Sequence, residues 1–307
     1  KYNDRLRDLT MSQNLRLFFS TLVLYWGFAI RYKGTSASQP AYILPPPTTI
    51  IGAYAQAILR ILGTSDKIEI KKRGEGRVLS RLMNAFIEST KTASAGVIGS
   101  IGLSYHQEIS RIVASMYKGG GEISRMYRVP FSAEFYKDAI PRIFPVQAVG
   151  VVYSPGAKLR LLWIFDLDVL LHELSRNGTR LSKEEFDDIA EIAKFNITRI
   201  GSKEGIAALE ESNYVTEVKI IEKDKTVRSL LYMPIEYVEP IDTTFFHEVV
   251  LTDLNYRLRS FYVPAFLASN NVLMPLPNDK LLPMVKLKRT AYTFDDGIAK
   301  GIIGVEI

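Results

Sequence analysis

The sequence predicts an α+β protein with a ferredoxin-like core, a mixed insertion after the first helix, and a β-rich C-terminal extension. Three observations support this class. The clear segments follow the order strand, helix, strand, strand, helix, strand, which is the ferredoxin-like order. A stretch of mixed pattern interrupts that order, and the last part of the chain has strand and turn patterns with no clear helix. We therefore expect the core at residues 15–65 and 143–225, the insertion at 66–142 and the extension at 226–307.

The first strand, loop and helix are the clearest part of the pattern. Leu15 to Phe28 is rich in large apolar residues and favours a strand buried on both faces. Residues 31–39 have the composition of a loop. Pro45, Pro46 and Pro47 favour an extended lead. Thr48 to Leu62 has helical spacing, and Gly63 is a typical helix end.

The insertion has weaker signals. Residues 71–77, KKRGEGR, predict a basic turn, and 78–88 have helical spacing. The segment TASAGVIGSIG that follows is small and flexible in composition, and YKGGGEIS is typical of a loop. We expect mixed structure here.

The second half of the core begins with two apolar runs. VQAVGVVY and KLRLLWIF flank a turn at residues 154–157, which predicts a β-hairpin. Ser182 and Glu185 form a capping box for a helix through Lys194. The run YVTEVKII, residues 214–221, predicts the last core strand.

Composition limits the function classes. The 307 residues carry 39 Lys and Arg against 33 Asp and Glu, a net charge of +6, which permits a polyanionic partner without requiring one. The chain has no cysteine, which excludes disulfides, thiolate catalysis and cysteine-ligated metals. The longest apolar run, Leu15 to Ile30, is interrupted by Arg16 and Ser20, so we expect a cytoplasmic protein without a membrane span.

Three motifs carry a resemblance to a known family. They are the aromatic-glycine-aromatic step Trp26, Gly27 and Phe28, the stretch LPPPTTIIGA, and the later RIGSKEG. Together they resemble the type I-A branch of CRISPR-associated protein family five, over residues 15–63 and 197–206. The long insertion and the C-terminal part have no motif that matches.

The resemblance implies an RRM-like (RAMP) form of the ferredoxin-like fold and a non-catalytic role in RNA binding. Members of this family hold the 5′ handle of the crRNA in the archaeal Cascade surveillance complex. The implied partners are therefore crRNA, the backbone and large subunits, with the small subunit and the helicase-nuclease as further candidates, and target DNA through the complex. The resemblance also implies a thumb-like role for the insertion at 66–142. We expect no cofactor, no metal and no membrane partner.

The start of the predicted helix at Thr48 is the first candidate site. A helix N-terminus offers unpaired N–H groups and partial positive charge, which favour phosphate. Thr48 and Thr49 would add hydroxyl donors, and Gly52 would let RNA approach. The alternative is a helix capped by threonine, with Gly52 making room for a neighbouring strand.

Further candidates surround that helix start. Trp26 and Phe28 could stack on bases, although aromatic residues at a strand end are more often core. Arg31 and Lys33 in the following loop are candidate phosphate ligands. In RIGSKEG, the candidates are Arg199, Ser202 and Lys203, which could equally form a simple polar loop. The second-rank candidates, in the insertion, are Lys71, Lys72, Arg73 and Arg77.

A catalytic role is the alternative to RNA binding. The segment FDLDVLLHE supplies Asp166, Asp168, His172 and Glu173, which could be drawn as a metal site, but a capped helix start with Asp168 near its N-terminus fits better. We expect no catalytic and no metal-binding residue. Two alternatives stay open: a metal-independent endoribonuclease that processes crRNA precursor, and a small-ligand enzyme, for which no Walker or G-x-G-x-x-G signature is found.

Overall fold

A computed structural model describes residues 10–12, 14–32, 38–64, 81–111, 146–202, 204–242, 244–269, 271–277 and 281–307. The helices are α1 (Pro47–Ile61), α2 (Arg81–Ser89), α5 (Leu167–Arg176), α6 (Lys183–Ala193) and the 3-10 helix η2 (Ile235–Tyr237). The strands of the first half are β1 (Thr10–Ser12), β2 (Leu15–Leu24), β3 (Gly27–Phe28), β4 (Ser38–Gln39), β5 (Thr90–Ile98), β6 (Leu103–Arg111), β7 (Val146–Tyr153), β8 (Lys158–Asp166) and β9 (Ala207–Val215). The remaining strands are β10 (Val218–Ile221), β11 (Thr226–Arg228), β12 (Met233–Pro234), β13 (Val238–Pro240), β14 (Phe246–Thr252), β15 (Leu258–Ser269), β16 (Val272–Pro275), β17 (Met284–Leu287), β18 (Ala291–Thr293) and β19 (Gly304–Val305).

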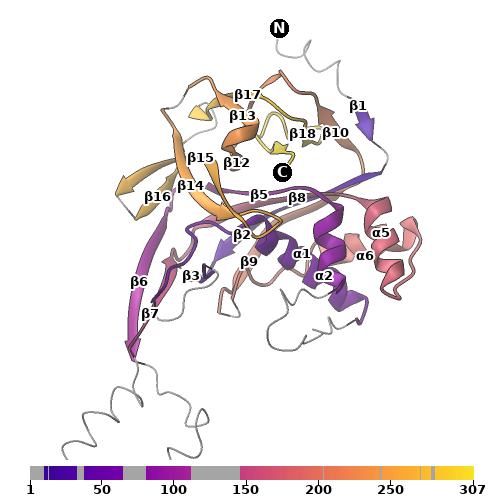
Figure 1. Ribbon diagram of the computed structural model, residues 1–307, viewed down its shortest axis with the longest axis horizontal. Coiled ribbons are helices and arrows are strands. Elements are labelled where there is room, and N and C mark those ends of the chain that lie inside the picture. The colour runs from indigo at the N-terminus through magenta and orange to yellow at the C-terminus, as the bar shows by residue number, and fades with distance from the viewer. Residues whose placement is uncertain are drawn as a thin grey trace, which may run out of the picture.

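A four-stranded antiparallel sheet with the order β5-β8-β2-β9 forms the centre of the molecule (Figure 1). Counted along the chain, these are its second, third, first and fourth strands. Helices α1 and α2 connect β2 to β5, and α5 and α6 connect β8 to β9. Each helical connection therefore joins two parallel strands that have another strand between them.

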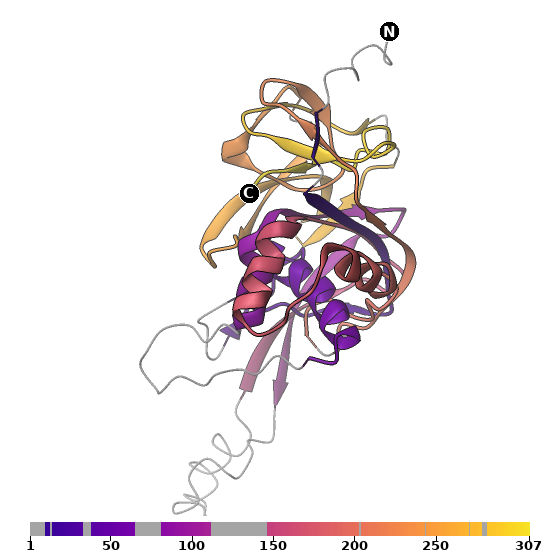
Figure 2. The ribbon, with the colours of Figure 1, turned by 90° about the vertical axis from the view of Figure 1, so that its right-hand side faces the viewer.

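Both faces of this sheet are covered. Because successive side chains of a strand alternate between faces, Phe18 and Leu22 of β2 pack with the helices, whereas Leu17 and Phe19 pack with the C-terminal strands. The ring of Phe19 stacks on Phe294, with centroids 4.7 Å apart. Figure 2 shows the resulting layers, with the helices below the sheet and the C-terminal strands above it. The predicted burial of the first strand on both faces is confirmed.

An aromatic cluster fixes the helical layer onto the sheet. The fully buried Trp163 of β8 stacks on Phe165 at 4.1 Å and on Tyr54 of α1 at 5.9 Å between centroids. Its indole N–H donates to the hydroxyl of Thr90 over 2.9 Å, so the polar atom of this core residue has a partner. Helix α1 is thereby held in a defined position against β8.

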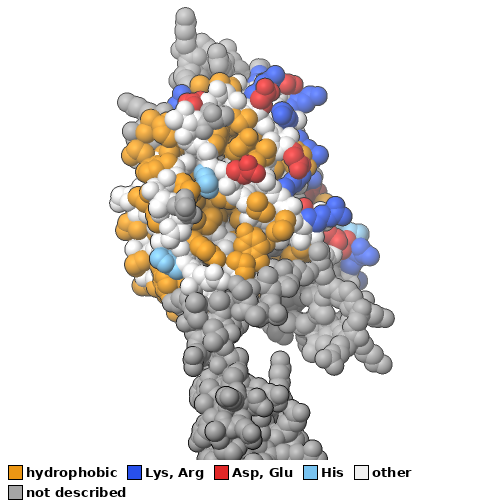
Figure 3. Space-filling model, turned by 60° about the vertical axis from the view of Figure 1, so that its left-hand side comes forward, with side chains coloured by type: hydrophobic (Ala, Val, Ile, Leu, Met, Phe, Trp, Pro, Cys, Tyr) orange, Lys and Arg blue, Asp and Glu red, His pale blue; other side chains and the backbone are white. Residues whose placement is uncertain are grey.

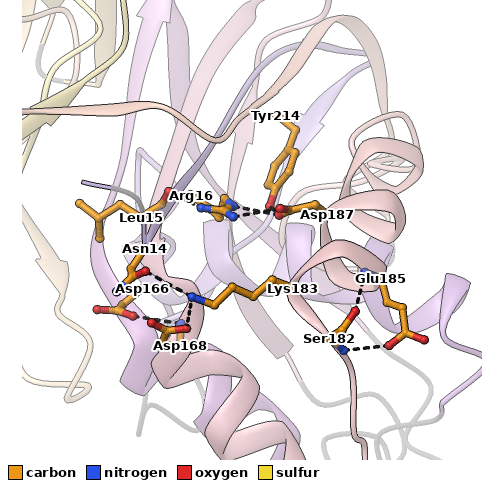
Figure 4. A network of polar contacts seen from close by, with 10 residues as sticks. All are labelled: Asn14, Leu15, Arg16, Asp166, Asp168, Ser182, Lys183, Glu185, Asp187 and Tyr214. Carbon is orange, nitrogen blue, oxygen red and sulfur yellow. Dashed lines mark hydrogen bonds and ion pairs between the residues drawn. The ribbon is translucent and has the colours of Figure 1, made fainter. Parts of the chain in front are cut away.

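The helices are also linked by polar contacts (Figure 4). Arg16 of β2, which is almost fully buried, donates to both carboxylate oxygens of Asp187 on α6 over 2.8 and 2.9 Å. The hydroxyl of Tyr214 on β9 donates to the same carboxylate. Lys183 at the start of α6 pairs with Asp168 of α5 over 2.6 Å. These contacts fix the position of α6 relative to the sheet.

A second, larger sheet lies beside the central one. Its order is β12-β15-β16-β6-β7-β3, with β14 paired to β15 and β4 paired to β7. Strands β6 and β7 form a long ladder that extends away from the helices in Figure 1. Two small sheets, β1-β10-β18-β19 and β11-β17-β13, complete the C-terminal part. The β-rich C-terminal extension is confirmed, but its strands pair with β6 and β10 and so are integrated into the molecule.

The predicted hairpin is wrong. VQAVGVVY forms β7, which pairs with β3, β4 and β6, whereas KLRLLWIF lies in β8, which pairs with β2 and β5. The second strand of the central sheet is instead β5, TKTASAGVI, which lies within the predicted insertion. Its small residues serve packing, because a Cβ at Gly96 would lie 2.2 Å from the carbonyl oxygen of Leu230.

The predicted domain boundaries change accordingly. Strands β5 and β6 do not form a separate 66–142 insertion, since β5 is an edge strand of the central sheet and β6 pairs with β7 and β16 in the second sheet. The last central strand is β9, Ala207–Val215, and ends where we expected it to begin. The rest of YVTEVKII forms β10, which pairs with β1 and β18 outside the central sheet.

Two helix starts are confirmed. Ser182 and Glu185 form the predicted capping box of α6. Helix α5 begins after Asp166, whose side chain accepts from the backbone N–H groups of Asp168 and Val169. Within the described residues, none of these helices is both long and apolar enough to span a membrane.

Candidate nucleic-acid interface

An open groove of about 1090 Å³ runs along one side of α1. Its other walls are the chain that follows β3 and the loop that leads into β9. The lining residues are Ala29, Ile30, Arg31, Thr49, Gly52, Ala53, Gln56, Leu59, Arg60, Gly63, Thr64, Met83, Arg199, Gly201, Ser202 and Glu204. The groove therefore brings together three segments that are far apart in the sequence.

One face of α1 forms the floor of the groove. Thr49, Gly52, Gln56, Arg60 and Gly63 follow one another at intervals of three or four residues, which places them on the same side of a helix. No atom lies within 4 Å of the position that a Cβ of Gly52 would take. The alternative in which Gly52 makes room for a neighbouring strand is therefore wrong, and this position is open to the groove.

The start of α1 differs from the expected anion site. The N-cap residue is Pro46, with no side-chain cap, and the helix begins at Pro47. The N–H groups of Thr49 and Ile50 both donate to the carbonyl of Pro46, over 2.9 and 3.2 Å. Because proline has no N–H, the first turn offers few free amides, and the threonine-capped helix is also wrong. Thr49 lines the groove, whereas Thr48 is not among its lining residues.

Three arginines enter the groove from three elements. Arg31 follows β3 and forms an isolated bridge with Ala41, and Arg60 is exposed in the last turn of α1. Arg199 comes from the loop before β9, and its Nε donates to the side-chain oxygen of Gln56 over 3.1 Å. The groove also contains the carboxylate of Glu204, so its described lining has three cationic side chains and one anionic side chain.

Gly201 and Ser202, in the loop before β9, pack closely against the chain that follows β3. Gly201 has a φ of +75°, and a Cβ there would lie 2.5 Å from Ile30. The N–H of Ser202 donates to the carbonyl of Ala29 over 3.3 Å. The Ser202 hydroxyl oxygen is buried and has no hydrogen-bond partner among the described residues. A ligand in the groove could supply that partner, because buried polar groups are normally paired.

The three residues of the aromatic-glycine-aromatic motif have different environments and roles. Trp26 is partly exposed, and its indole N–H donates to the backbone carbonyl of Glu204 over 2.6 Å. Phe28 is fully buried in the core, so its predicted role in base stacking is wrong. Gly27 is also buried, with a φ of +142°, and a Cβ there would lie 1.7 Å from the carbonyl oxygen of Val152. Gly27 therefore permits β3 to pair closely with β7 and does not itself present a surface to RNA.

The remaining candidates lie outside the described residues. They are Lys33, Lys71, Lys72, Arg73, Arg77 and Lys203. Their predicted contacts with RNA stay predictions.

The acidic segment considered as a metal site has structural partners. Asp166 caps α5, Asp168 pairs with Lys183, and Glu173 pairs with Arg176 over 2.9 Å. Within the part of the chain that the structure describes, no group of three or more His, Asp or Glu side chains is arranged to hold a metal ion. The predicted capped helix start is confirmed.

Gln56, Arg60 and Glu204 also line the groove but were not predicted from the sequence as site residues. The first two could have been found, because they continue the helical spacing of Thr49 and Gly52. Glu204 lies within the quoted RIGSKEG, but nothing in its sequence context distinguishes a groove residue from a solvated one.

No family model matches the sequence. The similar curated proteins are all named as CRISPR Cas5 proteins. The chain is 24% identical to "CRISPR system aCascade subunit Cas5 1" of Saccharolobus solfataricus over 205 residues, 67% of this chain and 68% of the relative. It is 23% identical to "CRISPR-associated protein Cas5 2" of the same organism over 276 residues, 87% of this chain and 85% of the relative. Among solved structures, a CRISPR protein from Archaeoglobus fulgidus has a TM-score of 0.50 at 18% identity, covering 95% of this chain and 98% of that chain.

The relatives cover between 67% and 87% of the chain. The structural neighbour extends the likeness in fold to almost the whole length of both chains. By sequence the chain is therefore similar to CRISPR-associated Cas5 proteins over two thirds or more of its length.

Proposed function

We propose that this protein is a non-catalytic subunit of a CRISPR surveillance complex and that its groove along α1 holds the 5′ handle of crRNA. One observation carries the proposal. Arg31, Thr49, Gly52, Arg199 and Ser202, which the sequence places in three separate segments, line the same groove. Convergence of arginine and hydroxyl donors on one open channel is the arrangement expected of a site for a nucleic-acid backbone.

The length of the groove suits an extended single strand of RNA. Helix α1 has 15 residues, and at 1.5 Å per residue its axis is about 22 Å long. The groove follows α1 from Thr49 near its start to Gly63 just beyond its end. A channel of this length accommodates several nucleotides of single-stranded RNA rather than one phosphate group.

The side chains of the groove support contact with the backbone more than base reading. Guanidinium groups bind phosphate oxygens in a planar, bidentate geometry. Gln56 holds Arg199 by its Nε, which leaves the terminal nitrogens of that guanidinium to other partners. Gly52 leaves a space at the centre of the floor where a ribose or phosphate could approach.

The fold and partners form the second part of the proposal. The strand order of the central sheet supports a ferredoxin-like RAMP core. The motifs of the sequence support the type I-A branch, and the name of one Saccharolobus relative describes a subunit of the archaeal Cascade complex. The proposed neighbours are the backbone and large subunits, then the small subunit and helicase-nuclease, with target DNA bound through the complex.

A binding and cleavage assay tests this function. Labelled repeat-derived RNA is incubated with the full chain, with and without EDTA, and both retention and product size are measured. We expect retention without a defined cut in both conditions. A single cut by the wild type, absent from the Arg199→Ala variant, would support the endoribonuclease alternative instead.

The groove itself is tested by Arg60→Ala, with Arg180→Ala as the matched control. Both arginines are exposed, but Arg180 lies in the loop between α5 and α6, away from the groove lining. Loss of one phosphate contact lowers the slope of log K against log salt by about 0.7 for a single strand. We expect this change for Arg60→Ala alone, and equal behaviour of the two variants would contradict the proposal.

A further inference from the structure

We propose that Trp26, Tyr153 and His106 form a stacking row, a second RNA contact on which bases of the strand stack after it leaves the groove. The inference rests on the proposed function, since it concerns the same RNA. It assigns a role to Tyr153 and His106, which lie outside the groove lining.

The three rings lie on neighbouring strands of the second sheet. Trp26 directly precedes β3, Tyr153 ends β7, and His106 is on β6. The ring centroids of Trp26 and Tyr153 are 5.7 Å apart, and those of Tyr153 and His106 are also 5.7 Å apart. The strands pair Tyr153 with both Gly27 and Ser104, so the row crosses three adjacent strands.

The row is partly exposed, and the polar atoms of Trp26 and His106 are engaged. His106 is exposed, and Trp26 and Tyr153 are half-buried. The Nε2 of His106 lies 2.7 Å from the hydroxyl of Ser104, and the indole N–H of Trp26 donates to the Glu204 carbonyl. The ring orientations are therefore held by hydrogen bonds, and the π surfaces are the chemistry that the row offers to a ligand.

Continuity with the groove identifies the occupant. Glu204 lines the groove and bonds to Trp26, so the row begins where that wall of the groove ends. A strand whose phosphates lie against Arg31 and Arg199 would carry its bases past Trp26. Aromatic side chains beside a cationic groove bind single strands without strong sequence preference, because every base has a π face. Figure 3 shows one face of the molecule on which hydrophobic side chains are widespread and histidine side chains lie between them, with Lys and Arg side chains, beside Asp and Glu, toward one edge.

The first test uses the fluorescence of Trp26. The chain has two tryptophans, and Trp163 is fully buried in the core, so Trp26 reports on a ligand at the row. Full chain is titrated with single-stranded oligo(A) RNA and, separately, with handle RNA. We expect quenching that saturates together with the anisotropy of labelled RNA, and loss of the quenching in Trp26→Phe. Saturated binding without quenching would overturn the inference.

The second test uses affinity. His106→Ala and Tyr153→Ala should each weaken oligo(A) binding by roughly fivefold or more, since stacking of one base is typically worth about this much. His106→Phe should retain affinity because it keeps a ring. His172→Ala is the matched control, because His172 is also exposed but lies on α5. Melting curves check that each variant is folded.

The outcomes separate this inference from the proposed function. If Arg60→Ala weakens binding and the row variants equal the His172→Ala control, the row is not an RNA contact although the groove is. If the row variants bind RNA normally but fail to join partner subunits, the row is a protein interface and the inference is wrong. If the wild type binds no RNA, both proposals fail.

Discussion

Thr49 and Gly52 lie one helical turn apart on the groove side of α1, and each contributes a different property. Thr49 supplies a hydroxyl, and Gly52 supplies open space. Opposite them, Ser202 has a buried hydroxyl oxygen with no described partner. Polar groups and free volume thus meet at the same place, which is expected for a site that a ligand completes.

Substitutions of Thr49 separate RNA binding from helix stability. Thr49→Ala removes one hydroxyl and should cost about 0.5–1.5 kcal/mol of RNA binding. Thr49→Asp suits the N-terminal turn of α1, which has no acidic residue, so thermal stability should be unchanged or higher. RNA affinity should nevertheless fall further than in Thr49→Ala, because a carboxylate repels phosphate. Melting curves and handle-RNA titrations at one salt concentration measure both effects.

Equal RNA affinity in the two Thr49 variants would mean that this residue affects only the helix. Loss of stability in both would mean that its hydroxyl has a structural role.

At the scale of elements, α6 is held to the sheet by one buried ion pair. Asp187 accepts two hydrogen bonds from Arg16 and one from Tyr214. The bond to Asp187 raises the pKa of the Arg16 guanidinium, and burial, followed by the same carboxylate, raises the pKa of Tyr214. Helix α6 leads into the loop that carries Arg199, so this pair also helps to set the position of the groove wall.

Asp187→Ala should destabilise the protein strongly. The substitution removes the carboxylate that pairs with the buried Arg16. Breaking comparable pairs costs about 3–5 kcal/mol, and partial exposure of Asp187 lowers the expectation to about 3 kcal/mol. Asp188→Ala is the matched control, since Asp188 is the exposed next residue of α6. Urea unfolding curves measure the difference. A change below about 1 kcal/mol would mean that packing alone holds α6.

At the scale of the whole molecule, the layers on both faces of the central sheet bury several tyrosines. Burial is the largest cause of a raised pKa for Tyr54, Tyr214, Tyr232 and Tyr292. Tyr54 and Tyr232 are fully buried and donate to Ser20 and to the carbonyl of Pro45, over 3.0 and 3.1 Å. These tyrosines tie the helical layer, the proline lead and the C-terminal segment to the same core.

The raised tyrosine pKa values predict loss of stability at high pH. A group that holds its proton more tightly in the folded state contributes stability that is complete below its unfolded pKa, about 10 for tyrosine, and is lost as pH rises above that value. The melting temperature should therefore be nearly flat from pH 7 to about 9 and fall steeply above about 10. Tyr54→Phe should lower the melting temperature at pH 7 but make the alkaline fall shallower. An equally steep fall in Tyr54→Phe would assign the effect to other groups.

The sequence by itself determined the elements with strong local signals. Apolar content along Leu15–Leu24 specifies a strand buried on both faces, the Ser182 and Glu185 pair specifies the start of α6, and helical spacing specifies α1. These features follow from periodicity and capping, which depend on residues close together in the chain. Several residues of the motifs that resemble the family line one groove, and their contact with RNA stays a prediction.

Only the tertiary structure decided which strands pair and which side chains reach the groove. The small residues of β5 carry little hydrophobic signal, yet β5 joins the central sheet by pairing with β8, and the C-terminal segment packs closely over its Gly96. VQAVGVVY has the pattern of a hairpin arm, but alternation does not specify the partner strand, so its pairing with β6 could not be read. Phe28 and Trp26 are equivalent aromatics in the sequence, and one is core while the other reaches the surface. Pairing and exposure depend on contacts between residues far apart in the chain, and a single sequence records them only through the structure that it forms.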